Sequence, residues 1–209
     1  MIKFIKFLSI YILIAHWQTF VFAEDKLYYR IASGLATDTD LQKIVRGDLE
    51  IDDRHTGILG FELGKPLVED VYGLPVDLVA KVGLIRHFER GLQDDFNQYT
   101  LSIKAYYKKF PWSIGTRLGF ANGLSYVDQI PFVERESLEG RNRNTSHLLH
   151  HMDLSFDMNL GDIFNSKKLK NCFFGVAISH RSGIFGKVKF YGDVDGGSNY
   201  NMFLIECLR

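Results

Sequence analysis

The strongest constraint on the fold is a period-two alternation of apolar and polar side chains that recurs along most of the chain. Such alternation predicts β-strands, because successive side chains of a strand point to opposite faces of the sheet. Eight segments show this pattern: 26–36, 56–64, 76–88, 98–108, 112–122, 148–160, 171–182 and 198–208. We therefore expect an all-β chain with eight strands.

The two faces of each segment differ sharply. In 148–160, Met152, Leu154 and Phe156 share one face, while Asp153 and Asp157 share the other. A soluble sandwich shows the same alternation. The segments, however, are about 10–13 residues long, nearer the roughly 9–11 that cross a bilayer than the usual 5–6. This length favours an eight-stranded antiparallel up-and-down transmembrane β-barrel.

The polar faces of these segments carry charges of both signs, which a filled barrel interior neutralises pairwise. The charged residues are Arg30, Glu62, Lys81, Lys104, Arg117, Asp153 and Asp157. Closure of the sheet is required, because an open edge in hydrocarbon costs several kcal/mol for each unpaired backbone group. The expected connections also alternate between longer and shorter, as outer-membrane barrels require.

The amino terminus resembles a secretory signal peptide. Lys3 and Lys6 precede the apolar stretch 7–22, and a small-residue cleavage pattern ends at Ala23. An uncleaved anchor helix is the alternative, but polar residues interrupt the apolar stretch, which is also short for a membrane span. We expect a signal peptide over 1–23 and one barrel domain over 24–209, exported to the outer membrane of a Gram-negative bacterium.

Charge and cysteine content exclude several classes of protein. Lys and Arg number 25 and Asp and Glu also number 25, so no basic excess indicates a nucleic-acid partner. Two cysteines exclude a fold built on a disulfide framework but allow one bridge between Cys172 and Cys207. If these two are cross-strand partners, His180 lies opposite Asn199, Ser182 lies opposite Gly197, and Glu206 is hidden inside.

The segment 171–182 ends in a candidate catalytic pair. His180 and Ser182 continue its apolar face, which the barrel turns toward lipid, at the end expected to face outward from the cell. A serine hydroxyl becomes a strong nucleophile when a neighbouring imidazole takes its proton. The structural alternative is a polar pair at a strand end, because His-x-Ser arises readily by chance.

Further polar groups near this pair suit a hydrolase. Asn199 across the ladder, or Asp195 or Asp193 in the adjoining loop, would fix the tautomer of the histidine. The backbone N–H of Gly183 is a candidate oxyanion donor. Around Asp193-x-Asp195-Gly196-Gly197 we expect a glycine-rich hairpin connection rather than a calcium loop.

A second group of histidines lies around the start of the segment 148–160. His147, His150 and His151 do not have metal-ligand spacing with any acid or cysteine, and neighbouring strand residues point to opposite faces. We expect solvated histidines at the end of a loop and no metal site.

Residues 112–209 resemble the lipid A 3-O-deacylase family. The likeness is carried by "GLSYVDQIPFVE" (123–134), "NTSHLLHHMDLSFDMNLGD" (144–162), "HRSGIFG" and "DGGSNY" (195–200). The resemblance implies an outer-membrane esterase whose histidine and serine correspond to His180 and Ser182. The family's acid is a glutamate, and Asn199 occupies the matching position here. An asparagine follows the family's serine, where this chain has Gly183.

Together these features support a serine esterase that removes an ester-linked acyl chain from lipid A of lipopolysaccharide in its own membrane. The reaction needs no cofactor. The main alternative is a noncatalytic eight-stranded barrel that serves as an adhesin, envelope stabiliser or small channel, and a periplasmic lipid-binding barrel is a third. The sequence does not decide between a monomer and a homodimer.

Overall fold

The computed structural model describes residues 26–209 except positions 49 and 185. The predicted signal peptide over 1–23 lies outside the described residues. Within them, no helix has the length and apolar character that a membrane-crossing helix needs.

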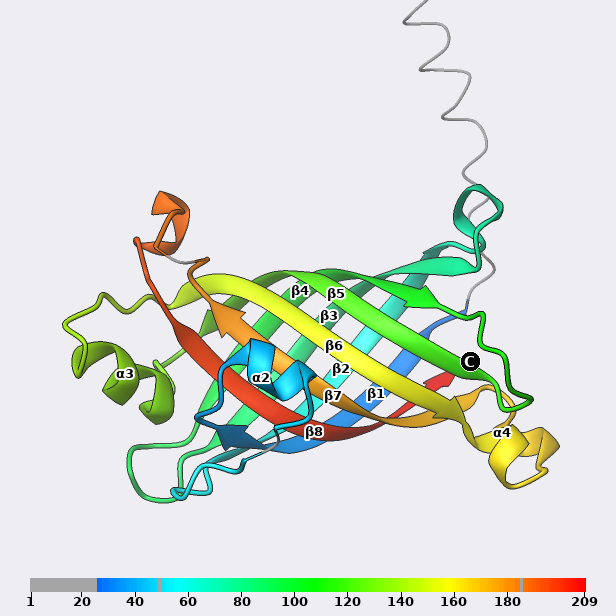
Figure 1. Cartoon of the computed structure of the whole chain (residues 1–209), viewed down its shortest axis with the longest axis horizontal. Helices are drawn as coiled ribbons and strands as arrows, with labels where there is room; N and C mark the ends of the chain where they lie inside the picture. The colour runs from blue at the N-terminus through cyan, green and yellow to red at the C-terminus, as the bar shows by residue number, and fades with distance from the viewer. Residues whose placement is uncertain (1–25, 49, 185) are drawn as a thin grey trace, which may run out of the picture.

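The chain forms a closed, eight-stranded antiparallel barrel in which every strand pairs with its sequence neighbours and β1 pairs with β8 (Figure 1). The strands are β1 (Tyr28–Thr37), β2 (Gly57–Val68), β3 (Val76–Phe88), β4 (Phe96–Tyr107), β5 (Thr116–Val127), β6 (Leu148–Asn159), β7 (Cys172–Ser182) and β8 (Gly197–Leu208). The predicted fold class is confirmed.

The connections between the strands contain short helices. They are α2 (Leu41–Val45), α3 (Phe132–Glu139) and α4 (Leu160–Ile163), together with the 3-10 turns η1 (Val71–Gly73), η2 (Lys167–Leu169) and η3 (Lys189–Tyr191). The sequence patterns predicted none of these helices.

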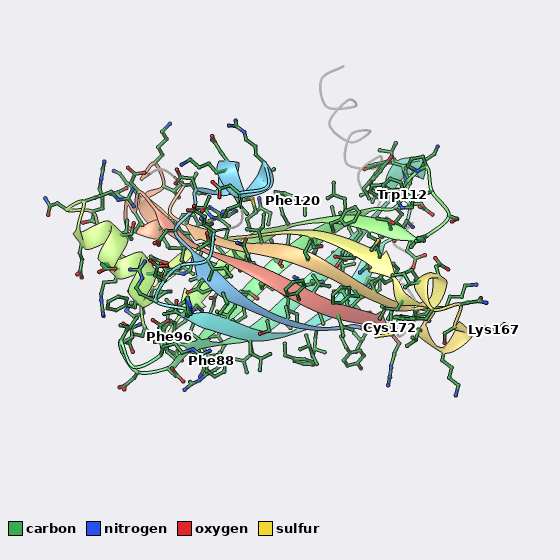
Figure 2. The ribbon with its side chains drawn as sticks, turned by 60° about the horizontal axis from the view of Figure 1, so that its bottom comes forward. Phe88, Phe96, Trp112, Phe120, Lys167 and Cys172 are labelled. Atoms are coloured by element: carbon green, nitrogen blue, oxygen red, sulfur yellow. A yellow bond between two sulfur atoms is a disulfide. The ribbon has the colours of Figure 1, made fainter. Side chains whose placement is uncertain are left out.

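The two ends of the barrel differ. At one end, which we call the termini rim, Leu27 and Arg209 exchange backbone hydrogen bonds of 2.6 and 2.9 Å. Helix α4 lies near the same end (Figure 1). The opposite end, the loop rim, carries the connections 38–56, 89–95, 128–147 and 183–196. Figure 2 shows Phe88 at the loop rim and Trp112 at the termini rim.

Three predicted strand boundaries were wrong by four or five residues, and one of them is the end of the fifth strand, which lies at Val127 rather than at 122. The fifth strand begins at Thr116 rather than 112, because residues 112–115 form a turn in which Trp112 Nε1 donates to Thr116 Oγ1 at 2.6 Å. The second strand continues to Val68 rather than ending at 64. It accommodates Pro66 at a register shift, where a missing N–H is tolerated.

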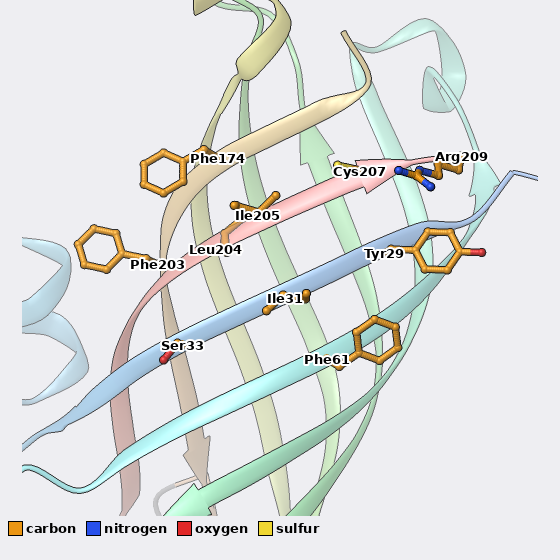
Figure 3. Close-up of a pocket in the computed structure, with 10 residues that line it drawn as sticks. All are labelled: Tyr29, Ile31, Ser33, Phe61, Phe174, Phe203, Leu204, Ile205, Cys207 and Arg209. Atoms are coloured by element: carbon orange, nitrogen blue, oxygen red, sulfur yellow. The ribbon is translucent and has the colours of Figure 1, made fainter. Parts of the chain in front are cut away.

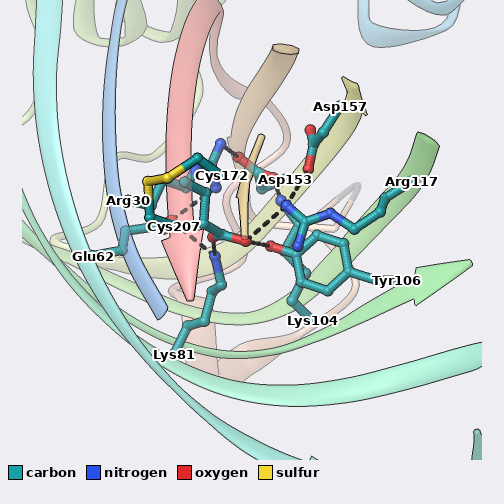
Figure 4. A network of polar contacts seen from close by, with 11 residues as sticks. Arg30, Glu62, Lys81, Lys104, Tyr106, Arg117, Asp153, Asp157, Cys172 and Cys207 are labelled. Atoms are coloured by element: carbon teal, nitrogen blue, oxygen red, sulfur yellow. Dashed lines mark hydrogen bonds and ion pairs between the residues drawn. A yellow bond between two sulfur atoms is a disulfide. The ribbon is translucent and has the colours of Figure 1, made fainter. Parts of the chain in front are cut away.

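The predicted charged residues all point into the barrel and are buried. Asp153 accepts from Arg30 at 2.8 Å and also pairs with Lys104. Glu206 contacts Lys81, Tyr106 at 2.7 Å and Arg117 at 3.0 Å (Figure 4). These opposite charges fill the middle of the lumen, as the alternation of polar and apolar positions predicts.

The last hairpin has the register expected from its two cysteines. Cys172 lies opposite Cys207, and the two form a disulfide with a Cα–Cα distance of 4.1 Å (Figure 4). Glu206 is fully buried, whereas Phe203 and Ile205 point outward and are exposed. The apolar outer face and the position of His180 opposite Asn199 are therefore confirmed.

Candidate active site on the outer face of the barrel

The candidate site lies where β6, β7 and β8 approach the loop rim. In the β7–β8 ladder, His180 faces Asn199 and Ser182 faces Gly197. Arg181, between the two candidate residues, is buried in the lumen, where it pairs with Glu134. Because side chains alternate along a strand, His180 and Ser182 lie on the outer face, at the end of β7 away from the chain termini.

A chain of hydrogen bonds fixes the imidazole of His180. Its Nδ1 lies 2.6 Å from Asn199 Oδ1, and Asn199 Nδ2 donates to the carbonyl oxygen of Thr39 at 3.0 Å. The second bond orients the amide so that its oxygen meets the ring. Since that oxygen only accepts, Nδ1 carries the proton and Nε2 keeps a lone pair.

Thr39 belongs to the β1–β2 connection, which returns over the outer face before α2 begins. Figure 1 shows α2 in front of β7 and β8, and the bond from Asn199 to Thr39 establishes this contact. Ile44 of α2 is buried. The connection therefore contacts the partner of His180 from the outer face.

Ser182 is half-buried, and among the described residues no side chain forms a hydrogen bond with its hydroxyl. Residues two apart on one strand are separated by about 6.6 Å along the strand axis. Rotation of both side chains toward each other shortens the gap between their polar atoms, and catalytic hydrogen bonds often tighten only when substrate binds.

The expected oxyanion role of Gly183 is not supported. Its N–H, expected to be unobstructed, donates to the carbonyl oxygen of Gly196 at 3.1 Å. The ladder between β7 and β8 thus continues one pair beyond Ser182 and uses this donor. The sequence pattern did not predict that continuation.

The three candidates for the group that holds His180 are now separated in space. Asn199 contacts the ring. Asp195 lies 3.3 Å from Arg143 of the β5–β6 connection, and Asp193 is exposed in the β7–β8 connection. In this structure, therefore, an amide rather than a carboxylate meets the imidazole.

An inner-face contact behind the site was missed by sequence reasoning. Glu134 of α3 is fully buried, pairs with Arg181, and accepts from Ser198 Oγ at 3.1 Å. Arg181 adjoins both candidate residues, and Ser198 adjoins Asn199. Hence α3 joins the ends of β7 and β8 from inside, at the level of the site.

The expected loop-end position was wrong for His150 and His151, and the expected solvation was wrong for His151. His150 and His151 belong to β6, so they point to opposite faces. His151 is buried in the lumen at 1% exposure, whereas His150 lies outside, where its Nε2 is 3.1 Å from Asn122 Oδ1. His147 remains in the connection, with Nδ1 2.7 Å from the carbonyl oxygen of Val127.

Between the site and the termini rim, an apolar groove of about 690 Å³ runs along the outer face of β7, β8, β1 and β2 (Figure 3). Its aromatic lining includes Tyr29, Phe61, Phe174 and Phe203. Arg209 lies at its end near the termini rim (Figure 3). A surface of this composition is suited to hydrocarbon chains rather than water.

No protein-family model matches the chain, and no curated protein matches it. Solved structures do. The outer membrane enzyme PagL is similar with a TM-score of 0.54 and 11% identity over 85% of this chain and 97% of that chain.

The N-terminal β-barrel domain of Pseudomonas aeruginosa OprF is similar with a TM-score of 0.50 and 9% identity over 88% of this chain and 98% of that chain. At these identities the likeness shows the fold alone. The protein therefore shares its closed eight-stranded barrel with outer-membrane proteins, one of them an enzyme.

Proposed function

We propose that the protein is an outer-membrane serine esterase that removes an ester-linked acyl chain from lipid A of lipopolysaccharide. The observation that carries this proposal is the hydrogen-bonded His180–Asn199 pair beside Ser182 on the outer face. A hydrolase of soluble esters has no need for a nucleophile on the apolar flank of a barrel. A nucleophile there meets fatty acyl esters of the surrounding lipid.

The proposed reaction uses side chains of this chain. Ser182 Oγ attacks the acyl carbonyl carbon while its proton moves to Nε2 of His180. The imidazolium then gives that proton to the departing sugar oxygen, and water hydrolyses the acyl-serine by the reverse sequence. Asn199 holds the productive tautomer throughout, although it stabilises the imidazolium less than a carboxylate would.

Lipid A is the proposed substrate for two reasons. The candidate pair lies at the loop rim, opposite the termini, which is the outward end of an outer-membrane barrel. Residues 112–209 also resemble the lipid A 3-O-deacylase family in the motif around His180 and Ser182. A location in the outer membrane of a Gram-negative bacterium belongs to the same proposal, and the barrel shape shared with PagL and OprF supports it.

A noncatalytic barrel is the competing function. The likeness to the OprF barrel domain supports it as well as it supports the enzyme. A channel role is disfavoured, because the charged groups of Figure 4 fill the middle of the lumen.

The test is mass spectrometry of lipid A from cells that express the wild type or Ser182→Ala in a background without lipid A deacylase. We expect wild-type cells to contain lipid A that lacks one acyl chain and Ser182→Ala cells to contain intact lipid A. Ser33→Ala is the matched control, because Ser33 is an exposed serine on the outer face of β1. Intact lipid A in wild-type cells, with the barrel present in the outer membrane, would favour the noncatalytic function.

A further inference from the structure

His150 occupies the position directly across the β6–β7 ladder from Ser182. Side chains directly opposite each other have Cβ atoms about 4.5–5.5 Å apart, whereas residues two apart on one strand are about 6.6 Å apart. Both side chains are on the outer face, because their neighbours His151 and Arg181 are buried in the lumen. His150 is therefore nearer to Ser182 in the sheet than His180 is.

The ring of His150 has a defined hydrogen-bonding role. Its Nε2 is 3.1 Å from Asn122 Oδ1. That oxygen only accepts, so Nε2 carries the proton and Nδ1 keeps a lone pair. The arrangement repeats the His180–Asn199 pair with the two ring nitrogens exchanged.

Neighbouring residues restrict the motion of this ring. The centroid of the Tyr191 ring lies 6.5 Å from that of His150, and Tyr191 is buried in a cluster with Leu138, Leu149 and Val194. The β7–β8 connection, through η3, thus packs beside the imidazole. The ring therefore has a hydrogen-bond partner in Asn122 and an aromatic neighbour in Tyr191.

We propose that His150 is a second catalytic base for Ser182, so that the nucleophile lies between two imidazoles, each held by an asparagine. This inference rests on the proposed function. His150 Nδ1 takes the Ser182 proton as the bond from Oγ to the acyl carbon forms. The bond from that carbon to the sugar oxygen then breaks, and the oxygen receives the proton from Nδ1.

Two bases acting in parallel give a distinctive pattern of losses. Each base alone sustains about half of the rate, so a single loss is small and the double loss is larger than the product of the two. We expect about a twofold loss for His150→Gln or His180→Gln, and about a 10³- to 10⁴-fold loss for the double variant. Glutamine keeps a hydrogen-bonding amide but does not accept the proton.

The experiment measures how fast an alkyl fluorophosphonate modifies Ser182 in the full chain in detergent micelles, with the adduct located by tandem mass spectrometry. In this reaction the serine oxygen bonds to phosphorus, fluoride leaves, and the serine proton passes to a base. The reaction therefore reports on the bases without lipopolysaccharide. His147→Gln is the matched control, because His147 lies three residues away and bonds to Val127 instead.

Circular dichroism shows whether each variant is folded. Asn122→Leu is a second test of whether His150 acts as a base, since it leaves His150 in place without its hydrogen-bond partner. Wild-type labelling rates in His150→Gln, with a double variant no slower than His180→Gln, would overturn the inference and leave the proposed function intact. An absence of Ser182 labelling in the folded wild type would overturn both.

Discussion

The polar groups of the lumen and those of the outer face are organised in opposite ways. In the lumen, Asp153 and Glu206 each meet at least two cationic side chains, and the charges compensate one another. On the outer face, His150 and His180 each meet one neutral amide and keep a lone pair free. The first arrangement uses its hydrogen-bonding capacity for stability, whereas the second leaves ring nitrogens available for the chemistry that we propose at Ser182.

This contrast predicts that the lumen controls stability and the outer face controls rate. The largest effect is expected for Glu206→Gln. Removing Glu206 from the buried ion network leaves Lys81 with Glu62 alone and Arg117 with Asp157 alone, so that one positive charge is in excess. We expect this to cost about 3–5 kcal/mol of the free energy of unfolding. Urea unfolding in detergent micelles, followed by circular dichroism, measures it.

Glu139→Gln is the control for that experiment, because Glu139 is exposed at the end of α3. We expect it to be neutral. The rate at which folded Glu206→Gln reacts with fluorophosphonate should equal that of the wild type, and a large fall in that rate would break the proposed division between lumen and outer face.

The disulfide gives the next largest effect. Replacing both Cys172 and Cys207 by Ser removes a link between β7 and β8 near the termini rim, and we expect the free energy of unfolding to fall by about 2–4 kcal/mol. The site lies at the other end of the same hairpin. Labelling of Ser182 at the wild-type rate would show that the ladder alone maintains its geometry.

Asn199→Leu should change rate and leave stability nearly unchanged. It removes the acceptor from His180 Nδ1 and the donor to Thr39, so the imidazole loses its fixed tautomer. With His150 still present, we expect about a twofold loss in the labelling rate. A loss of stability as large as that of Glu206→Gln would indicate that Asn199 has a structural role.

The smallest effect concerns the ion pairs of the loop rim. Arg54 donates from Nε to Asp52 Oδ1 at 2.7 Å and also contacts Glu136 of α3. The hydrogen bonds from Arg54 lower the pKa of Asp52 from 3.8 to about 2. Because the pKa of Asp52 is lower in the folded state than in the unfolded state, its ionised carboxylate adds to the free energy of unfolding. This stabilisation is fully present above the unfolded-state pKa and disappears as the pH falls through the folded-state pKa.

We therefore expect the stability difference between wild type and Asp52→Asn, about 1 kcal/mol, to be constant at neutral pH. It should shrink between pH 3.8 and about pH 2. Thermal unfolding at several pH values measures it. A stability difference that disappears already near pH 6 would show that a titratable group other than Asp52 causes it.

Much of the fold followed from the alternation of side chains. Arg30 and Phe203 were correctly placed inside and outside because a strand leaves a side chain only two directions. Two cysteines were enough to set the register of the last hairpin, since a slip of one residue would have exposed Glu206 to lipid.

The remaining features depend on contacts that no periodicity encodes. Trp112 and Ile114 alternate like strand residues but lie in a turn. Trp112 Nε1 donates to Thr116 Oγ1 and the Gly115 N–H donates to Asp162 Oδ2, and these two hydrogen bonds hold the turn. The hydrogen bond from the Gly183 N–H to the Gly196 carbonyl oxygen depends on where the β7–β8 ladder ends. The pairing of His150 with Ser182 requires the register between β6 and β7, for which the sequence offers no marker comparable to the cysteines.

The central claim is that the Ser182 side chain faces hydrocarbon. It is tested most directly by a nitroxide attached to Ser182→Cys in lipid vesicles, with collision rates measured for oxygen, which concentrates in hydrocarbon, and for a water-soluble nickel chelate. Phe203→Cys supplies the lipid-facing reference and Asp193→Cys the loop reference. We predict that position 182 resembles position 203, with high oxygen and low nickel collision rates. Values like those at position 193, or low rates for both reagents, would contradict the account.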